Sequence, residues 1–270
     1  MENIIEITDY SFSYQKHLII NYLNLNIKKG SFTTLVGNTG GGKTTLVKLI
    51  TGLLKGKGEI KIFNKAIDDS TITDNFIKEI GVVLGNPYDN FVSSTVKDDL
   101  IFPLENLQLK KNEIDKYLSD IVSYFKIEDL LDTNPMDLTV SDASVVALAS
   151  ALITKPKLLI LDDAFIKMNT IVKKEKLLLL KDLKKRFNIS IFNITHDINE
   201  IMYGDYAVLM HNGSIVLEGI VSDFVKNEKT IKKYNYVLPY NVDLSNKLNY
   251  YDVIRDDIYD MDKLVKTIWK

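Results

Sequence analysis

Apolar and polar positions along this chain follow two different periods. Near the N-terminus apolar residues recur at every second position, which is typical of β-strands that bury one face. Further along, short continuous apolar runs alternate with segments whose apolar residues recur about every 3.6 positions, as on one face of a helix. These patterns predict strands over residues 4–14, 17–27, 31–37, 56–64, 79–87, 157–163 and 189–197, helices over 43–54, 113–127 and 170–187, and a hairpin over 206–219.

The order of these elements predicts the architecture. Strands and helices alternate through most of the chain, which indicates an α/β domain with a mainly parallel sheet. A stretch rich in helix formers over about 90–153 interrupts the alternation, so we expect an inserted helical subdomain. From residue 221 the sequence becomes rich in tyrosine, asparagine and lysine and carries no evident catalytic motif. We therefore expect a domain over 1–220 and a small C-terminal appendage over 221–270, a possible dimerisation element.

Composition and charge narrow the function classes. With 34 basic and 36 acidic residues the formal net charge is −2, so the chain lacks the basic field that nucleic-acid binding usually requires. The chain has no cysteine, which excludes disulfides and thiolate metal sites. Its first residues do not resemble a signal peptide, and no apolar run approaches the ~20 residues of a membrane span. We expect a soluble intracellular protein without a nucleic-acid partner.

The segment "GNTGGGKTT" carries the strongest functional signal. It satisfies the pattern G-x-x-x-x-G-K-[ST], follows a predicted strand and opens a predicted helix, as a phosphate-binding loop (P-loop) does. Glycines let backbone N–H groups surround a β-phosphate, and the helix N-terminus adds partial positive charge. We expect Lys43 to reach the β- and γ-phosphates and the Thr44 hydroxyl to bind Mg²⁺. The predicted ATP-binding residues of this loop are Gly37, Asn38, Thr39, Gly40, Gly41, Gly42, Lys43, Thr44 and Thr45.

An apolar strand that ends in acids, "KLLILDD", is the usual companion of such a loop. Its first acid, Asp162, is placed to complete the Mg²⁺ shell where the strand emerges beside the phosphates. An acid at a strand end can also be a surface or capping residue, but the P-loop upstream favours the metal role. The sequence thus predicts a site for ATP and Mg²⁺.

With both motifs in place, the first ~220 residues resemble an ATP-binding-cassette (ABC) ATPase. The resemblance implies a P-loop NTPase fold of ABC ATPase type, with a mostly parallel core sheet, an antiparallel β subdomain and the inserted helical subdomain. It also implies that Tyr14 stacks on adenine, although an ordinary strand aromatic explains the same residue equally well. His196, in "NITHD", matches the family's switch histidine, which contacts the γ-phosphate.

Two further segments narrow the resemblance. "GNPYDNFVSSTVKDDLIFPLEN" is similar to the "QNPDNQFV…TV.DD..F.LEN" segment of the ATPase subunits of energy-coupling factor (ECF) transporters, and "YVLPYNVDLSNKL" is similar to the tail through which those subunits pair. The resemblance implies a peripheral subunit on the cytoplasmic face of the membrane. It would drive a transmembrane coupling protein and a substrate-capture protein for vitamins or metal ions. A groove beside residues 85–99 would receive the coupling helix. Asp89, Asp98 or Asp99 is a candidate to pair with a basic residue there, although acids in such a segment are more often simply solvated.

The chain departs from the family pattern at positions that serve hydrolysis. Where the family has a glutamine that bridges Mg²⁺ and the attacking water, this chain has Gly85. Where the family has the glutamate that polarises water, this chain has Asp163, whose side chain is one methylene shorter. Because a general base must lie within hydrogen-bond reach of its proton, the shortening should slow hydrolysis, unless a backbone shift makes up the distance. Asn169 replaces an aspartate that crosses to the opposite subunit in the family. The predicted catalytic residues are Asp163 and His196.

The family signature "LSGGQ" corresponds here to "LTVSD", residues 138–142. In the family this helix start binds the γ-phosphate held by the opposite subunit. Here Val140 and Ser141 place side chains where the backbone must approach phosphate closely, and Asp142 brings a negative charge toward it. Thr139 and Asp142 instead fit a capping box, in which a hydroxyl and an acid satisfy exposed backbone N–H groups.

These departures predict how the subunit works. In an ABC dimer each site combines the P-loop of one subunit with the signature helix of the other, so a homodimer would contain two doubly weakened sites. We therefore expect a heterodimer with an intact cassette paralogue, in which this subunit binds Mg-ATP and hydrolyses it slowly. The alternative is an ATP-binding structural or regulatory subunit that hydrolyses no ATP. A soluble cassette protein that acts on DNA or ribosomes is disfavoured by the near-neutral charge.

Overall fold

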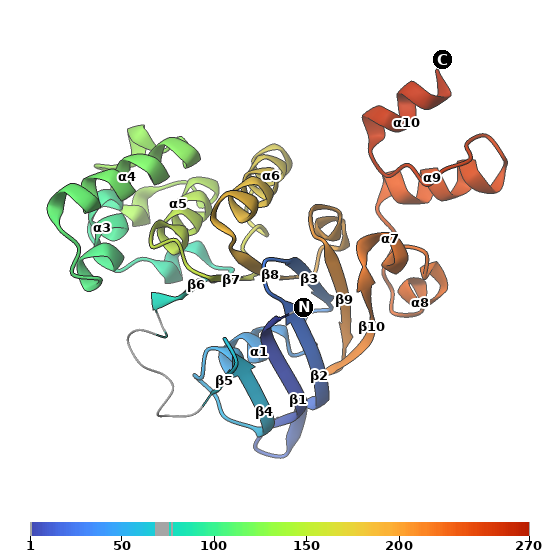
Figure 1. Ribbon diagram of the computed structural model, residues 1–270, viewed down its shortest axis with the longest axis horizontal. Coiled ribbons are helices and arrows are strands. Elements are labelled where there is room, and N and C mark those ends of the chain that lie inside the picture. The colour runs from blue at the N-terminus through green and yellow to red at the C-terminus, as the bar shows by residue number, and fades with distance from the viewer. Residues whose placement is uncertain (1, 68–75, 77, 270) are drawn as a thin grey trace.

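Within residues 2–67, 76 and 78–269, which the computed structural model describes, two β-sheets form the framework of the protein (Figure 1). The larger sheet has the strand order β10-β9-β3-β8-β7-β6. Its neighbouring strands are parallel except for the β9–β10 pair, which is antiparallel. The strands are β3 (Phe32–Gly37), β6 (Ile80–Val83), β7 (Leu158–Asp162), β8 (Ser190–Thr195), β9 (Tyr206–His211) and β10 (Ser214–Ile220).

The central strands β3, β7 and β8 are buried along their whole length, because other elements cover both faces of the larger sheet. Successive side chains of a strand point to opposite faces. Leu158 and Ile160 of β7 pack with helix α1 (Lys43–Ile50) and the second sheet, while Leu159 and Leu161 pack with the helices of the other layer. This is why these strands read as continuous apolar runs.

The second sheet is antiparallel, with the order β2-β1-β4-β5. Its strands are β1 (Asn3–Tyr14), β2 (His17–Lys28), β4 (Lys57–Ile62) and β5 (Lys65–Ala66). Apolar residues at alternate positions of β1 and β2 pack against α1, as the two-residue period predicts. The helix predicted over 43–54 ends already at Ile50, because Gly52 takes a φ of 75° that a continuing helix does not allow.

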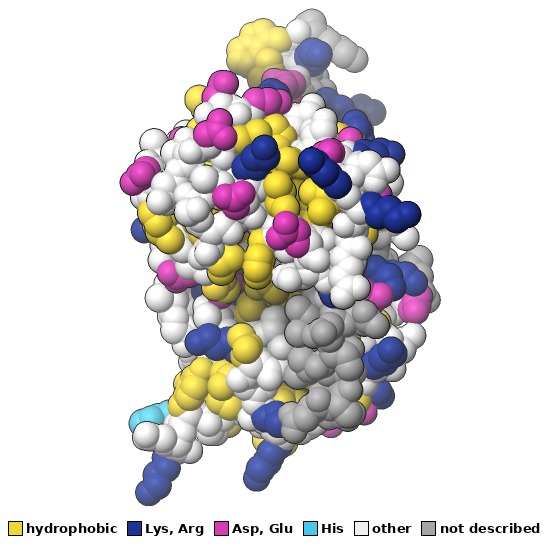
Figure 2. All heavy atoms as spheres, turned by 90° about the vertical axis from the view of Figure 1, so that its left-hand side faces the viewer, with side chains coloured by type: hydrophobic (Ala, Val, Ile, Leu, Met, Phe, Trp, Pro, Cys, Tyr) yellow, Lys and Arg dark blue, Asp and Glu magenta, His cyan; other side chains and the backbone are white. Residues whose placement is uncertain are grey.

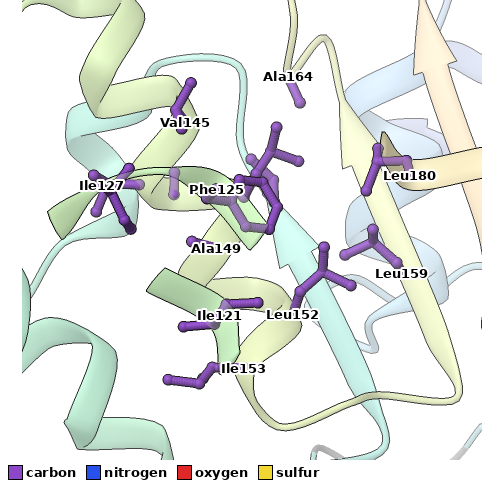
Figure 3. Close-up of a cluster of buried hydrophobic side chains, with 14 of the residues drawn as sticks. Ile121, Phe125, Ile127, Val145, Ala149, Leu152, Ile153, Leu159, Ala164 and Leu180 are labelled. Atoms are coloured by element: carbon purple, nitrogen blue, oxygen red, sulfur yellow. The ribbon is translucent and has the colours of Figure 1, made fainter. Parts of the chain in front are cut away.

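The inserted helices share one buried cluster with the larger sheet. α3 (Val96–Asn106), α4 (Lys111–Phe125) and α5 (Val140–Ile153) lie between β6 and β7 in the sequence, and α6 (Thr170–Phe187) covers the sheet beside them (Figure 1). Phe125 is fully buried in this cluster, together with Val145 of α5 and Leu180 of α6 (Figure 3). Burying an aromatic side chain contributes about 1.5–3 kcal/mol, so the cluster fixes the helical layer on the sheet.

The described C-terminal residues form the helices α7 (Val221–Phe224), α8 (Glu228–Lys233), α9 (Tyr240–Tyr250) and α10 (Met261–Ile268). Phe224, Ile231 and Leu238 pack with Ala207 and Leu209 of β9 in a further buried cluster. The first part of the appendage is therefore anchored on the larger sheet. Across the part of the chain that the structure describes, no helix is long and apolar enough to cross a membrane.

The hairpin between β9 and β10, which the sequence predicts over 206–219, turns at Asn212 and Gly213, a residue pair that favours a two-residue turn. Both residues have positive φ, 47° and 77°, as a type I′ turn requires. The turn also supports the P-loop, because the Gly213 N–H donates to the Gly41 carbonyl oxygen at 3.2 Å. A Cβ atom at Gly213 would lie 2.1 Å from the Ile19 carbonyl oxygen, so a larger residue cannot fit without backbone movement.

We predict that Gly213→Ala destabilises the protein more than Gly40→Ala. Both glycines have a φ of 77°, but a Cβ atom at Gly40 would meet nothing within 4 Å. The Gly40 variant therefore measures the cost of positive φ alone, roughly 1–2 kcal/mol, and the difference between the variants measures the clash with Ile19. Denaturant unfolding of both variants without nucleotide tests this expectation. Equal losses of stability would contradict it.

Candidate nucleotide-binding and hydrolysis site

The candidate site lies at the carboxyl ends of β3, β8 and β7. β8 lies between the other two strands, with Thr195 opposite Val36 of β3 and Ile194 opposite Asp162 of β7. The P-loop follows β3, the paired acids end β7, and His196 follows β8. Because parallel strands place their carboxyl ends at one edge of a sheet, the topology brings the predicted site residues to the same edge.

Glycines give the P-loop its shape. Gly40 and Gly42 have φ values of 77° and 96°, which residues with a Cβ atom rarely adopt. A Cβ atom at Gly41 would lie 2.9 Å from the Asn38 carbonyl oxygen. α1 begins without a side-chain cap, so its first N–H groups remain available to a phosphate. The predicted loop residues all lie between the end of β3 and the first turn of α1: Gly37, Asn38, Thr39, Gly40, Gly41, Gly42, Lys43, Thr44 and Thr45.

The Lys43 ammonium group is held inside this loop. Its side chain is buried, and Nζ donates to the carbonyl oxygens of Gly37 at 2.8 Å and Asn38 at 3.2 Å. A buried ammonium group is costly unless it is hydrogen-bonded, so the two carbonyl oxygens keep its charge inside the loop. Phosphate oxygens can take the place of these carbonyl oxygens, with stronger charge-assisted bonds.

Asp162 is buried beside the first turn of α1. Its carboxylate is hydrogen-bonded to the Thr44 side chain, while Oδ1 has no hydrogen-bond partner among the described residues. Burial raises the pKa of Asp162 above its usual range, although the bond to Thr44 and the charge of Lys43 act in the opposite direction. An unpaired buried carboxylate oxygen next to a hydroxyl fits Mg²⁺, which takes few protein ligands and completes its shell with phosphate and water.

Asp163 and His196 form a direct pair. Oδ1 of Asp163 accepts from the backbone N–H of His196 at 3.1 Å and lies 2.8 Å from the ring Nδ1. Asp163 has a φ of 53°, in the left-handed region that aspartate tolerates better than most residues. Its own N–H donates to the Ile194 carbonyl oxygen at 2.8 Å, which ties the acid to β8. The candidate base is thus paired with the candidate γ-phosphate contact.

Gly85 lies against the strand end that carries both acids. A Cβ atom at this position would lie 3.0 Å from the Asp162 carbonyl oxygen and 3.3 Å from Cβ of Asp163. Gly85 is therefore close to the site but offers no ligand to it. The Asn90 side chain holds this loop, because it donates to the Leu84 carbonyl at 3.3 Å and accepts from the Leu84 N–H at 2.9 Å. The sequence does not predict this role of Asn90, because an asparagine in a loop is common and indicates only a turn.

The helix start at 139–142 is capped by its own side chains. The Thr139 hydroxyl accepts from the Asp142 N–H at 3.2 Å and donates to the Asp142 carboxylate at 2.7 Å. The predicted capping box is only half formed, because the carboxylate bonds to the hydroxyl of Thr139 and not to its N–H. Val140 is 40% exposed, so the helix start is open to another molecule. The Asp142 N–H is occupied by this cap and is therefore not free for a ligand.

Of the three acids predicted to pair with a partner, Asp99 is not available, so the prediction is wrong for this residue. Its side chain is 2% exposed, and Oδ1 accepts from the N–H groups of Val92 at 2.8 Å and Ser93 at 3.1 Å. Burial raises the pKa of Asp99 despite these bonds. Asp98 accepts from the Thr95 hydroxyl at 2.7 Å in the cap of α3. Both acids therefore shape the entry into α3.

Tyr14 ends β1 and is 42% exposed. Its ring packs edge-on against Phe12, with the ring centroids 4.8 Å apart. The next strand, β2, reaches the P-loop, because a Cβ atom at Gly42 would lie 3.1 Å from the Ile19 carbonyl oxygen. Tyr14 thus lies in the sheet that borders the loop, and its stacking on adenine stays a prediction.

Comparison with known proteins identifies the class to which this fold and site belong. The family model described as "ABC transporter" matches residues 20–166. The energy-coupling factor transporter ATP-binding protein EcfA1 of Ligilactobacillus salivarius is 36% identical, over 85% of this chain and 82% of its own length. EcfA1 of Lactobacillus johnsonii is 30% identical, over 98% of this chain and 96% of its own length. The chain therefore belongs to the ABC transporter family.

Solved structures agree with this assignment. CbiO1 from Clostridium perfringens, part of the ABC transporter complex cbiONQ, has a TM-score of 0.77 and 30% identity, covering 87% of this chain and 95% of its own. A dimeric ATP-binding cassette with bound ADP and Pi has the same fold, with a TM-score of 0.72 at 23% identity over 80% of this chain and 98% of its own. The predicted fold class is confirmed. Within its family the chain is an ATP-binding subunit of the energy-coupling factor type.

We predict that Asp162→Asn stabilises the chain without nucleotide but removes the Mg²⁺-dependent part of its stabilisation by ATP. Burial raises the pKa of Asp162, so the folded protein holds this proton more tightly than the unfolded chain does. The ionised Asp162 carboxylate therefore destabilises the folded protein. This loss of stability grows as pH rises from the pKa of Asp162 in the unfolded chain to its pKa in the folded protein. A neutral amide avoids it, so the variant's advantage should be largest above both values.

Thermal unfolding measured over a range of pH, with and without Mg-ATP, tests this expectation. The advantage of Asp162→Asn should shrink as pH falls toward and below the unfolded pKa. Asp132→Asn removes one charge at an exposed position and is the matched control. A variant that is less stable than the native chain above both pKa values, or that keeps full Mg²⁺-dependent stabilisation by ATP, would contradict the assignment of Asp162.

Proposed function

We propose that this subunit binds Mg-ATP and hydrolyses it slowly, as one half of a heterodimer with an intact cassette paralogue. The complex would be an importer for vitamins or metal ions. The observation that carries the proposal is the Asp163–His196 pair. A carboxylate is present where the base is expected, but it is short and its Oδ1 lies 2.8 Å from a histidine nitrogen. This arrangement supports a retained hydrolytic site with low activity.

ATP would be held by the loop residues between β3 and α1. Loop N–H groups and Lys43 would bind the β- and γ-phosphates, in place of the carbonyl oxygens that Lys43 contacts. Thr44 and Asp162 would hold Mg²⁺, which when bound neutralises charge on the phosphate oxygens. Tyr14 would stack on the adenine ring. The unpaired Oδ1 of Asp162 is the observation that supports the metal role.

Hydrolysis would need the Asp163–His196 pair to open. His196 would turn toward the γ-phosphate, and Asp163 would accept a proton from the attacking water. Asp163 is one methylene shorter than the family glutamate, and its backbone already has a φ of 53°. A further backbone shift toward the water would add strain to a conformation that is already sparsely populated. We therefore expect a slow chemical step at this site.

The signature helix supports a heterodimer. Its defect, with Val140 and Ser141 in place of glycines, affects the ATP of the opposite subunit and not the ATP of this chain. A homodimer would combine both defects in each of its sites. With an intact paralogue, one site would pair this P-loop and Asp163 with a normal signature, and the other would pair the partner's base with residues 138–142.

The transmembrane coupling protein would dock on a groove of about 590 Å³ between β6, α3 and α5, which borders the predicted segment 85–99 at Asn90. Its lining includes Val82, Pro103 and Ala147, and polar atoms of Asn90 and Ser150. Figure 2 shows the side on which α3 and β6 lie, where hydrophobic side chains gather in a hollow among charged ones. An amphipathic helix suits such a surface. With a substrate-capture protein in the same complex, this would place the subunit peripherally on the cytoplasmic face of the membrane.

A second candidate function is an ATP-binding structural or regulatory subunit of the same kind of complex, without hydrolysis. The pairing of Thr139 with Asp142 and the absence of a ligand at Gly85 favour it. ATP-dependent pairing with no phosphate release from any combination of subunits would identify this function.

We predict that Asp163→Ala lowers phosphate release at this subunit's own site by about 10²-fold, the usual contribution of a general base. Asp163→Glu should raise release above the native rate, because the added methylene extends the carboxylate toward the water. The measurement uses a heterodimer whose partner carries an inactivating change in its own base. Rapid ATP hydrolysis by the purified single chain, abolished by Asp163→Ala, would contradict the heterodimer.

We predict that replacing Val140 and Ser141 together by glycine raises hydrolysis at the partner's site and leaves this subunit's own site unchanged. Glycines remove the Cβ atoms that hold a phosphate away from the helix start. Each glycine also lowers helix stability by roughly 1 kcal/mol, so unfolding is measured in parallel. Carrying out the assay in the Asp163→Ala background isolates the partner's site. An unchanged rate in a folded complex would show that the signature does not limit turnover.

A further inference from the structure

The C-terminal appendage brings Tyr236 to the segment that carries His196. Tyr236 lies between α8 and α9, and its N–H donates to the Ile231 carbonyl oxygen at 3.1 Å. Its side chain is 8% exposed and belongs to a buried cluster with Ile198 and Ile201, which follow His196 along the chain. The packing therefore fixes this phenol against the segment that follows His196 (Figure 1 shows α7 beside β10).

Tyr236 and His196 line the same cavity, whose volume is about 700 Å³. The loop after Asp163 contributes Phe165 and Met168 to its walls, and the start of α6 contributes further residues. The cavity is therefore bounded by the site on one side and by the appendage on another. A polar group of the appendage can act on the Asp163–His196 pair from here.

The Tyr236 hydroxyl is buried and has no hydrogen-bond partner among the described residues. A buried polar atom without a hydrogen bond is unfavourable, and a partner reached in another conformation of the site would relieve this cost. Burial raises the pKa of Tyr236 to about 12, and the negative charge of Asp163 makes a smaller contribution in the same direction. The phenol therefore stays protonated at neutral pH and can donate a hydrogen bond.

An ion network fixes the backbone beside His196. The Lys173 ammonium group donates to Asp197 at 2.7 Å and pairs with the buried carboxylate of Glu200, which also accepts from Asn193 at 2.8 Å. Asp197 follows His196 directly, so the network ties this point to α6 and β8. The His196 side chain is 43% exposed, so its ring can turn while its backbone stays in place.

We propose that Tyr236 is a positioning residue for hydrolysis: when the His196 ring turns toward the γ-phosphate, the Tyr236 hydroxyl takes the place of the ring and donates a hydrogen bond to Oδ1 of Asp163, which keeps its bond from the His196 backbone N–H. This inference rests on the proposed function, because it needs His196 to contact the nucleotide. A carboxylate accepts at both oxygens, so Tyr236 would hold one and leave the other for the attacking water. Docking of the appendage would then set the orientation of the base.

The test follows the His196 ring by NMR in the full chain within its heterodimer, with Mg²⁺ and a non-hydrolysable ATP analogue as the probe. The chain has only His17, His196 and His211, so a histidine-labelled sample gives few ring signals to assign. In the native chain the analogue should shift the His196 signals. In Tyr236→Phe this shift should be smaller, because the open pair has lost its hydrogen bond.

Steady-state kinetics give a second readout. Tyr236→Phe should lower kcat roughly two- to thirty-fold and leave KM for ATP unchanged, because the hydroxyl acts on the base and not on nucleotide binding. Tyr259→Phe is the matched control, since Tyr259 also carries a buried hydroxyl in the appendage but does not line the cavity. It should behave as the native chain does in both measurements.

The outcomes separate this inference from the proposed function. If the analogue shifts the His196 signals equally in the native chain and in Tyr236→Phe, with equal kcat, the inference is overturned and the proposed function stands. If the native His196 does not respond to the analogue, the proposed function fails and the inference fails with it. A lower melting temperature for Tyr236→Phe would show that the hydroxyl is a structural partner, which also overturns the proposal.

Discussion

The parallel register of β3, β8 and β7 is the constraint on which the rest of this protein depends. It sets Asp162 opposite Ile194 and Val36 opposite Thr195, so the P-loop, the acids and His196 emerge together at one edge. Burial on both faces holds this register, because a slip by one residue would move every side chain to the opposite face. The sheet therefore brings the site residues together, and the loops that follow its strands add the remaining groups.

The residues proposed to bind the nucleotide and those proposed to hydrolyse it differ in their local structure. The P-loop keeps its positive-φ glycines, and Lys43 and Asp162 lie buried within it and beside it. Beyond β7 the chain instead combines a short acid at a φ of 53° with a histidine bonded to it. At the signature helix, Thr139 and Asp142 bond to each other. This ATP-binding subunit of the energy-coupling factor type thus keeps the glycines, the buried lysine and the buried aspartate of the candidate nucleotide site, and departs from the family pattern at the positions proposed to act on water and on the partner's phosphate.

The appendage is part of this arrangement. Ala207 and Leu209 of β9 face its helices, while Val208 and Met210 of the same strand face the antiparallel sheet and α1. β9 therefore connects the layer that carries the P-loop to the layer that carries Tyr236. Through the hairpin at Gly213, which donates to Gly41, the same strand also supports the loop itself.

The sequence by itself determined the features that rest on local chemistry. Glycine spacing in the P-loop, the positive φ of Asn212 and Gly213, and the period of apolar residues require no distant partner, so they could be predicted. Tertiary structure decided the burial of Asp99, the half-formed cap at Thr139, the pairing of Asp163 with His196 and the place of Tyr236. Most of these features join residues from different strands, helices or loops. All of them depend on which hydrogen-bond partner or cavity-lining residue is nearest in space. No local pattern encodes that distance, because it is set by how the sheets and helices pack.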